Sequence, residues 1–197
     1  MKQILILLAL IFFTGCTSNE KTSASSFDQN EKIMEPKIES MKDGKVIITK
    51  YYDFLCGYCQ KGASNIRAMK EKYGDKIEVQ LKHFVIHPTA LESHRVMECA
   101  NQQGKGEAFF FEYFKNYFGV TDTNKLTKLY TDIALDTNSL ETCLKSDVVT
   151  NIIKQQEKDG RMIGVQGTPY YVINNRDKIR GHVSSARFES LIDQYLQ

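Results

Sequence analysis

Residues 45–59 read Lys-Val-Ile-Ile-Thr-Lys-Tyr-Tyr-Asp-Phe-Leu-Cys-Gly-Tyr-Cys, and this stretch decides the fold. Its first ten residues are rich in β-branched and aromatic side chains, which predicts a buried strand. The strand runs directly into two cysteines three positions apart, Cys56 and Cys59. Apolar side chains at helical spacing follow over residues 60–73, and a second apolar run covers residues 77–86. The chain therefore predicts a β-α-β unit with a Cys-x-x-Cys motif where the first strand meets the helix.

The next 75 or so residues show no strand pattern. Helices are expected at 90–103, 106–118, 123–135, 139–144 and 146–162. The α/β pattern then resumes as a strand over 168–173, a turn at 174–177, a short strand around Ile179 and a helix over 185–196. These elements predict an α/β layer architecture in which a helical insertion, about 89–163, separates two sheet-forming halves.

Composition sets further bounds. The chain has 197 residues, of which 42% are hydrophobic, enough for a packed core. Its 26 basic residues are balanced by 24 acidic residues, so no broad positive surface is expected and nucleic acid is excluded as a partner. We expect no cofactor.

The N-terminus has the pattern of an export signal. An apolar run from Ile4 to Phe13 is too short to span a bilayer, and it ends at Thr14, Gly15 and Cys16. A cysteine directly after small residues resembles the bacterial lipobox, in which that cysteine receives diacylglycerol. We therefore expect a lipoprotein signal peptide at 1–15, lipidation of Cys16, a flexible tether over 16–36 and a folded domain over 37–197. The alternative is an ordinary cleaved signal in which Cys16 is incidental.

The chemistry is expected at Cys56 and Cys59. At a helix N-terminus the first thiolate faces unpaired backbone N–H groups and the positive end of the helix dipole, which lowers its pKa. Cys56 is therefore the expected attacking or leaving sulfur, and Cys59, one turn further along, the resolving thiol. Two other interpretations remain open: a purely structural Cys56–Cys59 disulfide, and a zinc site.

The zinc alternative has limited support. A second closely spaced cysteine pair would be needed for a zinc site made of four cysteines, and the sequence contains none. The remaining candidate ligands are His83, His87, His94 and Cys99. We predict no metal site, and redox catalysis is the favoured interpretation of the motif.

Two segments together resemble the thioredoxin-like fold in its DsbA-type form: Asp53 to Cys59, and Gly167-Thr168-Pro169. The resemblance covers residues 45–196 and implies a thioredoxin-like fold with an inserted helical domain. In this superfamily the proline has a cis peptide bond and lies beside the redox pair, while the preceding residue binds substrate backbone. These roles are carried over to Pro169 and Thr168.

The residues between the cysteines refine the resemblance. Gly57 and Tyr58, with Thr168 before the proline, are similar to the isomerase DsbC, whereas the helical insertion is closer to the oxidase DsbA. Lys50 stands where thioredoxin and DsbA carry a buried acid. If Lys50 points toward the sulfurs it favours the thiolate of Cys56, and if it faces solvent the site simply lacks that acid.

The expected activity is thiol–disulfide exchange with cysteine-containing exported proteins, by an oxidase on the extracytoplasmic (periplasmic) side of the cell envelope. A membrane redox partner would regenerate the active-site pair, and the lipid would anchor the protein in the membrane. The alternatives are a disulfide isomerase or reductase, and a non-enzymatic, metal-binding thioredoxin-like lipoprotein. The Cys-x-x-Cys motif alone does not choose between these alternatives and the oxidase.

Two cysteines remain once Cys16, Cys56 and Cys59 have these roles. Cys99 and Cys143 both lie on predicted helices, and in an oxidising compartment we expect them to form a structural disulfide. The alternative is a pair of buried free thiols that pack as small hydrophobic side chains.

Overall fold

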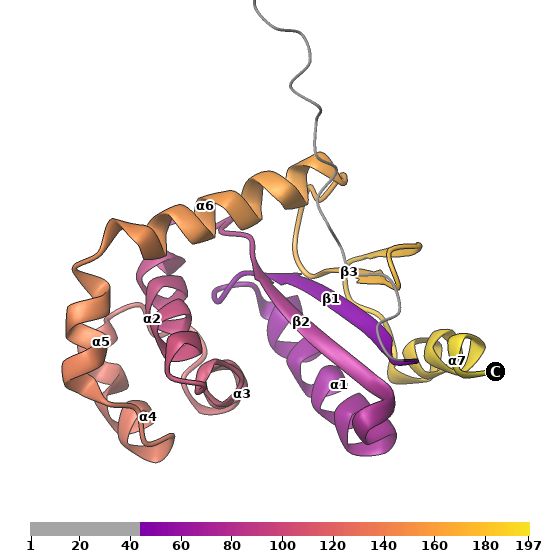
Figure 1. Ribbon diagram of the computed structural model, residues 1–197, viewed down its shortest axis with the longest axis horizontal. Coiled ribbons are helices and arrows are strands. Elements are labelled where there is room, and N and C mark those ends of the chain that lie inside the picture. Colours follow the sequence, from indigo (N-terminus) through magenta and orange to yellow (C-terminus); the bar gives the residue numbers. More distant parts are fainter. Residues whose placement is uncertain (1–43) are drawn as a thin grey trace, which may run out of the picture. The chain divides into compact units, whose positions relative to one another are not determined.

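A four-stranded sheet with helices on both faces positions the functional elements (Figure 1). The computed structural model describes residues 44–197. The predicted signal peptide, the lipidation site at Cys16 and the tether over 16–36 lie outside these residues. No helix within the described part of the chain has the length and apolar character needed to cross a bilayer.

The sheet has the strand order β2-β1-β3-β4. Strand β1 (Val46–Tyr52) is central and buried along its whole length, which explains its continuous apolar and aromatic sequence. Strand β2 (Ile77–His83) lies parallel to it, while β3 (Tyr170–Ile173) and β4 (Asp177–Arg180) form an antiparallel hairpin on its other side. This mixed sheet with a helical insertion is the α/β, thioredoxin-like fold that was predicted.

Side chains of β1 enter cores on both faces of the sheet. On one face, Val46 and Ile48 pack with α1 (Gly57–Tyr73) and with α7 (Ser185–Leu196). On the other face, Tyr51 packs with Phe84, Tyr170 and Val172. A Cβ atom at Gly160 of α6 (Asp147–Met162) would lie 2.9 Å from the Tyr51 ring, so glycine allows this helix to approach the sheet closely.

The helical insertion lies beside the sheet in Figure 1. Its elements are η2 (Pro88–Ala90), α2 (Leu91–Gln102), α3 (Gly106–Asn116), η3 (Thr123–Leu126), α4 (Thr127–Asp132), α5 (Thr137–Leu144) and α6. The aromatic side chains of α3 are mostly core: Phe109, Phe110, Tyr113 and Phe114 pack around Tyr52 and Phe54, which come from the end of β1 and just beyond it.

Several boundaries differ from those predicted. The start of α1 is not among them: the helix begins at Gly57 with Cys56 as its N-cap, which agrees with the helix N-terminus expected at Cys56. Strand β2 ends at His83 rather than at residue 86, since the N–H groups of Ile86 and His87 donate to the Asp53 carboxylate rather than to a neighbouring strand. The helix expected over 123–135 divides into η3 and α4, and β3 begins after Pro169, which has no N–H to donate.

Helix α6 also contacts the C-terminal end of β2 and the segment that follows it. The side chain of Gln156 accepts a hydrogen bond from the His83 N–H at 2.8 Å, and Glu157 accepts one from the Val85 N–H at 3.0 Å. A helix of the same chain therefore satisfies backbone donors where β2 ends.

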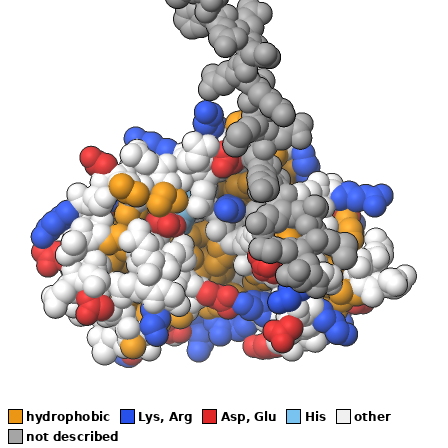
Figure 2. Space-filling model, in the orientation of Figure 1, with side chains coloured by type: hydrophobic (Ala, Val, Ile, Leu, Met, Phe, Trp, Pro, Cys, Tyr) orange, Lys and Arg blue, Asp and Glu red, His pale blue; other side chains and the backbone are white. Residues whose placement is uncertain are grey.

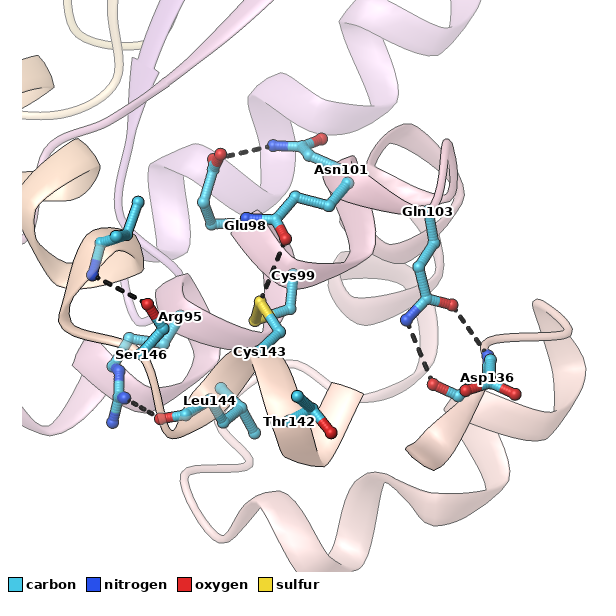
Figure 3. Close-up of a disulfide and its surroundings, with 12 residues drawn as sticks. Arg95, Glu98, Cys99, Asn101, Gln103, Asp136, Thr142, Cys143, Leu144 and Ser146 are labelled. Carbon is cyan, nitrogen blue, oxygen red and sulfur yellow. Dashed lines mark hydrogen bonds between the residues drawn. A yellow bond between two sulfur atoms is a disulfide. The ribbon is translucent and has the colours of Figure 1, made fainter. Parts of the chain in front are cut away.

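A disulfide joins Cys99 of α2 to Cys143 of α5, with 5.9 Å between the Cα atoms (Figure 3). The side chain of Gln103 adds two hydrogen bonds to the backbone of Asp136 at the start of α5. Arg95 donates to the carbonyl oxygen of Leu144 at the other end. Helix α5 is thus held to α2 along its length.

Figure 2 shows hydrophobic surface near the centre of one face of the molecule, with charged side chains around it. The exposed hydrophobic residues are few, and they include Tyr58 of the Cys-x-x-Cys motif, which is 59% exposed. The side chain of Tyr58 is therefore not part of the core.

Candidate active site

Cys56 occupies the N-cap of helix α1, at the point where the chain leaves β1. Its Sγ accepts a hydrogen bond from the Cys59 N–H at 3.3 Å. Side-chain oxygens usually make this contact at a helix N-cap, and here a sulfur takes their place. Both cysteines are free in the structure.

The pKa of Cys56 is lowered from about 9 to about 5. The largest cause is a hydrogen bond from the side chain of Cys59, and smaller contributions come from Thr168 and from the backbone N–H groups of Cys59 and Tyr58. Partial burial acts in the opposite direction and is outweighed. Cys56 is therefore a thiolate at neutral pH, and a good leaving group.

Cys59 has the opposite character. Its side chain is completely buried, and burial raises its thiol pKa far above the ordinary value. The hydrogen bond with Cys56 raises it further, because that bond uses the Cys59 proton. One motif thus contains an accessible thiolate and a buried thiol that keeps its proton.

Lys50 on β1 lies beside Cys59. It is completely buried, and its Nζ donates to the carbonyl oxygen of Cys59 at 3.2 Å. The ammonium group lies 5.0 Å from the ring centroid of Phe110 and 5.7 Å from that of Tyr171. Desolvation lowers the pKa of Lys50 to about 8, and the nearby cysteines partly oppose this. The solvent-facing alternative for Lys50 is therefore wrong.

A glycine of α1 makes room for this buried cation. A Cβ atom at Gly62 would lie 2.2 Å from the hydroxyl of Tyr171 and 3.2 Å from the Lys50 Nζ. No other side chain fits there without displacing one of these groups.

Thr168 and Pro169 lie against Cys56 from the other half of the sheet. The peptide bond between them is cis, and the carbonyl oxygen of Thr168 lies 3.3 Å from the Cys56 Sγ. Residues 112 positions apart in the chain are thus brought together at the reactive sulfur.

Gly57 and Tyr58 are exposed at the start of α1. The ring of Tyr58 is stacked on His182, with 6.4 Å between the centroids, and the Nζ of Lys61 lies 5.4 Å from the Tyr58 centroid. An aromatic and cationic surface therefore borders the reactive sulfur.

The carboxylate of Asp53 organises the loop before Cys56, a role that sequence reasoning missed. It accepts from the N–H groups of Leu55, Ile86 and His87, and the His87 Nδ1 lies 2.9 Å away. The available signal was an Asp directly after a strand, which is typical of a side chain that accepts hydrogen bonds from the next few backbone N–H groups. No comparable signal in the sequence identified its partners after β2, the N–H groups of Ile86 and His87.

The structure does not bring the four residues of the zinc alternative together at one site. Cys99 is in the disulfide with Cys143 and is not available as a ligand. His83 and His94 are buried with 2.8 Å between their Nδ1 atoms, while His87 lies against Asp53. Within residues 44–197, no three His, Cys, Asp or Glu side chains are arranged to hold a metal ion.

Comparison with solved structures finds this fold in several bacterial proteins. The thioredoxin-like oxidoreductase from Silicibacter pomeroyi DSS-3 has a TM-score of 0.68 and 21% identity, over 77% of this chain and 86% of that one. The thiol-disulfide exchange protein alpha-DsbA2 from Wolbachia pipientis has a TM-score of 0.69 and 16% identity, over 79% and 84%. The catalytic domain of Proteus mirabilis ScsC has a TM-score of 0.67 and 17% identity, over 80% and 86%.

Among curated proteins, the chain is similar to part of the Na(+)/H(+) antiporter NhaA 1 of Mycobacterium sp. (strain KMS). The two are 22% identical over 142 residues, which is 68% of this chain and 22% of that protein. The chain thus spans about a fifth of the length of the curated relatives that it matches. The model of the DSBA-like thioredoxin domain family matches residues 47–193, which include both cysteines of the motif and the cis-proline. This chain therefore belongs to the family of DSBA-like thioredoxin domains.

Proposed function

We propose that this protein is an extracytoplasmic thiol–disulfide oxidoreductase that oxidises cysteines of exported proteins through Cys56 and Cys59. One observation carries the proposal: the pKa of Cys56 is lowered to about 5, while that of its buried partner Cys59 is raised. A stable Cys56 thiolate favours the reduced pair, so the disulfide form gives up its oxidising equivalents readily.

The reaction proceeds in two exchanges. A client thiolate attacks the Cys56 Sγ of the Cys56–Cys59 disulfide, forming a mixed disulfide, and the electron pair of the broken bond passes to the Cys59 sulfur. That buried sulfur takes up a proton, as its raised pKa favours. A second client thiolate then attacks the client sulfur, and Cys56 leaves as a thiolate. The client gains one disulfide and the protein gains two electrons, which a membrane redox partner accepts to restore the disulfide.

Substrate binding is assigned to the surface around Cys56. The Thr168 backbone, beside Pro169, is placed to receive an extended peptide, and the exposed Gly57 and Tyr58 form the adjoining surface. Lys50 adds a buried positive charge that favours the thiolate form of Cys56.

The reduction potential of the Cys56–Cys59 pair tests whether the protein oxidises or reduces its clients. The full chain is equilibrated in glutathione buffers and the reduced fraction is measured. A value near −120 mV, about that of a strong oxidant, supports the oxidase, and a value near −270 mV, about that of thioredoxin, supports a reductase instead. A Cys59→Ala variant should accumulate mixed disulfides with clients, and Cys56→Ala should form none.

Location in the cell envelope is part of the proposal. It rests on the apolar N-terminal run that ends at Cys16, together with the membership of residues 47–193 in the DSBA-like family. Mature protein should begin at a diacylated Cys16 and partition with membranes, and Cys16→Ser should abolish both. An intact mass without diacylglycerol would contradict the lipid anchor and leave the redox proposal standing.

A further inference from the structure

A groove of about 550 Å³ lies between the active-site helix α1 and helix α3. Its volume is within the range of ligand-binding sites in proteins. One wall consists of Gln60, Lys61, Ala63, Ser64 and Arg67 of α1, and the other of Phe111, Phe114 and Lys115 of α3. Aromatic rings and long polar side chains thus face each other beside the redox motif.

The charges of this groove are all positive. Among its described lining residues, Lys61, Arg67 and Lys115 are cationic and none is acidic. The guanidinium of Arg67 lies 4.6 Å from the centroid of the Phe111 ring, so a planar cation rests on the aromatic wall.

The acidic side chains of α3 have other partners. Glu107 forms an ion pair with Lys70, and Glu112 accepts from Asn116. They therefore do not offset the three cations as direct partners.

The groove is continuous with the redox site along α1. Gln60 and Lys61 directly follow Cys59, and the Lys61 ammonium also contacts the ring of Tyr58. Arg67 lies eleven residues after Cys56, which is about 16 Å along a helix at roughly 1.5 Å per residue. An extended peptide covers that distance in about five residues.

We propose that the groove binds an acidic, aromatic-containing segment of a client polypeptide, two to five residues from the client cysteine that reacts with Cys56. Carboxylates of the client would pair with Arg67 and Lys115, and an aromatic side chain would pack on Phe111. This inference rests on the proposed function, which it extends by naming the clients that the protein prefers.

Paired peptides test the preference. Each peptide carries one cysteine as a mixed disulfide with thionitrobenzoate, followed two to five residues later by either Asp-Phe-Asp or Asn-Phe-Asn. The reduced full chain with Cys59→Ala is added. The Cys56 thiolate forms a bond to the peptide sulfur, the bond between the peptide sulfur and thionitrobenzoate breaks, and the coloured thionitrobenzoate anion leaves with the electron pair. Its release gives the rate of mixed-disulfide formation for each peptide.

We expect the acidic peptide to react about fivefold faster than its neutral counterpart, the effect of one or two partly exposed ion pairs. The ratio should fall toward one in high salt, because exposed charges are screened. Arg67→Gln and Lys115→Gln should each lower the ratio, and the double variant should bring it close to one. Lys154→Gln, which removes an exposed lysine from α6, is the matched control and should keep the ratio of the parent chain.

Equal rates for the two peptides in the parent chain would overturn the groove proposal while leaving the exchange activity established. Failure of both peptides to release thionitrobenzoate would instead contradict the proposed function. In that case, fluorescence anisotropy of cysteine-free versions of the two peptides tests whether the groove prefers the acidic peptide. Tighter binding of the acidic peptide, lost in Arg67→Gln, supports the groove proposal, and equal affinities overturn it.

Discussion

At the scale of single residues, the buried cation of Lys50 lowers the stability of the fold, and we propose that it also favours the thiolate form of Cys56. A lysine whose folded pKa of about 8 lies below its ordinary value of 10.5 destabilises the fold at neutral pH, and the penalty disappears as pH rises from 8 to 10.5. The shift corresponds to about 3 kcal/mol. We expect Lys50→Met to raise the free energy of unfolding at pH 7 by up to that amount, and to raise the pKa of Cys56. Urea unfolding and thiolate absorbance titration measure the two effects.

Lys76→Met is the control for this change. Lys76 is exposed in η1 (Gly74–Lys76), before the first residue of β2 and at the opposite end of the strand from His83. Lys76→Met should change neither the free energy of unfolding nor the pKa of Cys56. A Lys50→Met protein with an unchanged thiolate titration would show that the buried cation does not act on Cys56.

The Cys56 thiolate links redox state to stability. Because its folded pKa is lowered to about 5, the thiolate stabilises the reduced fold above the unfolded pKa, and the gain is lost as pH falls through 5. From pH 5 to pH 7 the thiolate adds about 3 kcal/mol to the free energy of unfolding of the reduced protein, since each pH unit contributes about 1.4 kcal/mol. The Cys56–Cys59 disulfide lacks this contribution and closes a very short loop, so its own contribution to stability is small.

We therefore expect the reduced protein to melt several degrees above the oxidised protein at pH 7, at roughly 2–4 °C per kcal/mol. The difference should shrink steadily toward pH 4. Thermal melts of both redox forms across this range measure it. An oxidised form that melts higher at pH 7 would support a reductase in place of the oxidase.

At the scale of secondary-structure elements, Asp53 joins the end of β1 to the segment that follows β2. Its carboxylate accepts from three backbone N–H groups and contacts His87, and Asn in its place offers one oxygen fewer. We expect Asp53→Asn to lower the free energy of unfolding by about 3 kcal/mol, through the loss of charge-assisted hydrogen bonds. Urea unfolding tests this, with Asp75→Asn, exposed in η1, as the control. A loss as small as that of the control would mean that the loop holds together without the carboxylate.

The same element boundaries show what local sequence can predict. The apolar run of β1 and the helical spacing after Cys59 were sufficient for the order and type of these elements, because both patterns are local. The end of β2 was misplaced by three residues, since it depends on Asp53, which lies about 30 residues earlier in the chain. The start of α1 at Cys56 was predicted correctly, because the strand that runs directly into the Cys-x-x-Cys motif marks the junction locally.

At the scale of the whole molecule, the disulfide between Cys99 and Cys143 holds the helical insertion together across 44 residues of chain. Cross-linking a loop of this length stabilises a fold by about 4 kcal/mol through the entropy of the unfolded chain. We expect the double variant Cys99→Ala/Cys143→Ala to lose a comparable amount in urea unfolding. The exchange activity of Cys56 should persist wherever the variant is folded. A loss below about 1 kcal/mol would show that the contacts of Gln103 and Arg95 hold α5 in place without the cross-link.

The site is a product of long-range packing, and this limited what could be predicted. The motif itself identifies Cys56 and Cys59, and the resemblance to a known family placed Thr168 and Pro169 beside them. The orientation of Lys50 stayed open, because a fully buried strand gives no alternation from which to choose a face. The cationic groove between α1 and α3 was not foreseen, since Arg67 and Lys115 lie on helices whose contact depends on the tertiary fold.

The two borders of the sheet have a consequence for how the protein behaves when crowded. At the border formed by β2, Gln156 occupies the backbone donor of His83, and the strand carries Glu78 and Lys82. The other border is β4, a strand of four residues that carries Asp177, Lys178 and Arg180. Short, positively charged border strands resist pairing with copies of themselves. Within residues 44–197 both borders of the sheet thus carry charged side chains, so we expect concentrated native protein to resist edge-to-edge pairing.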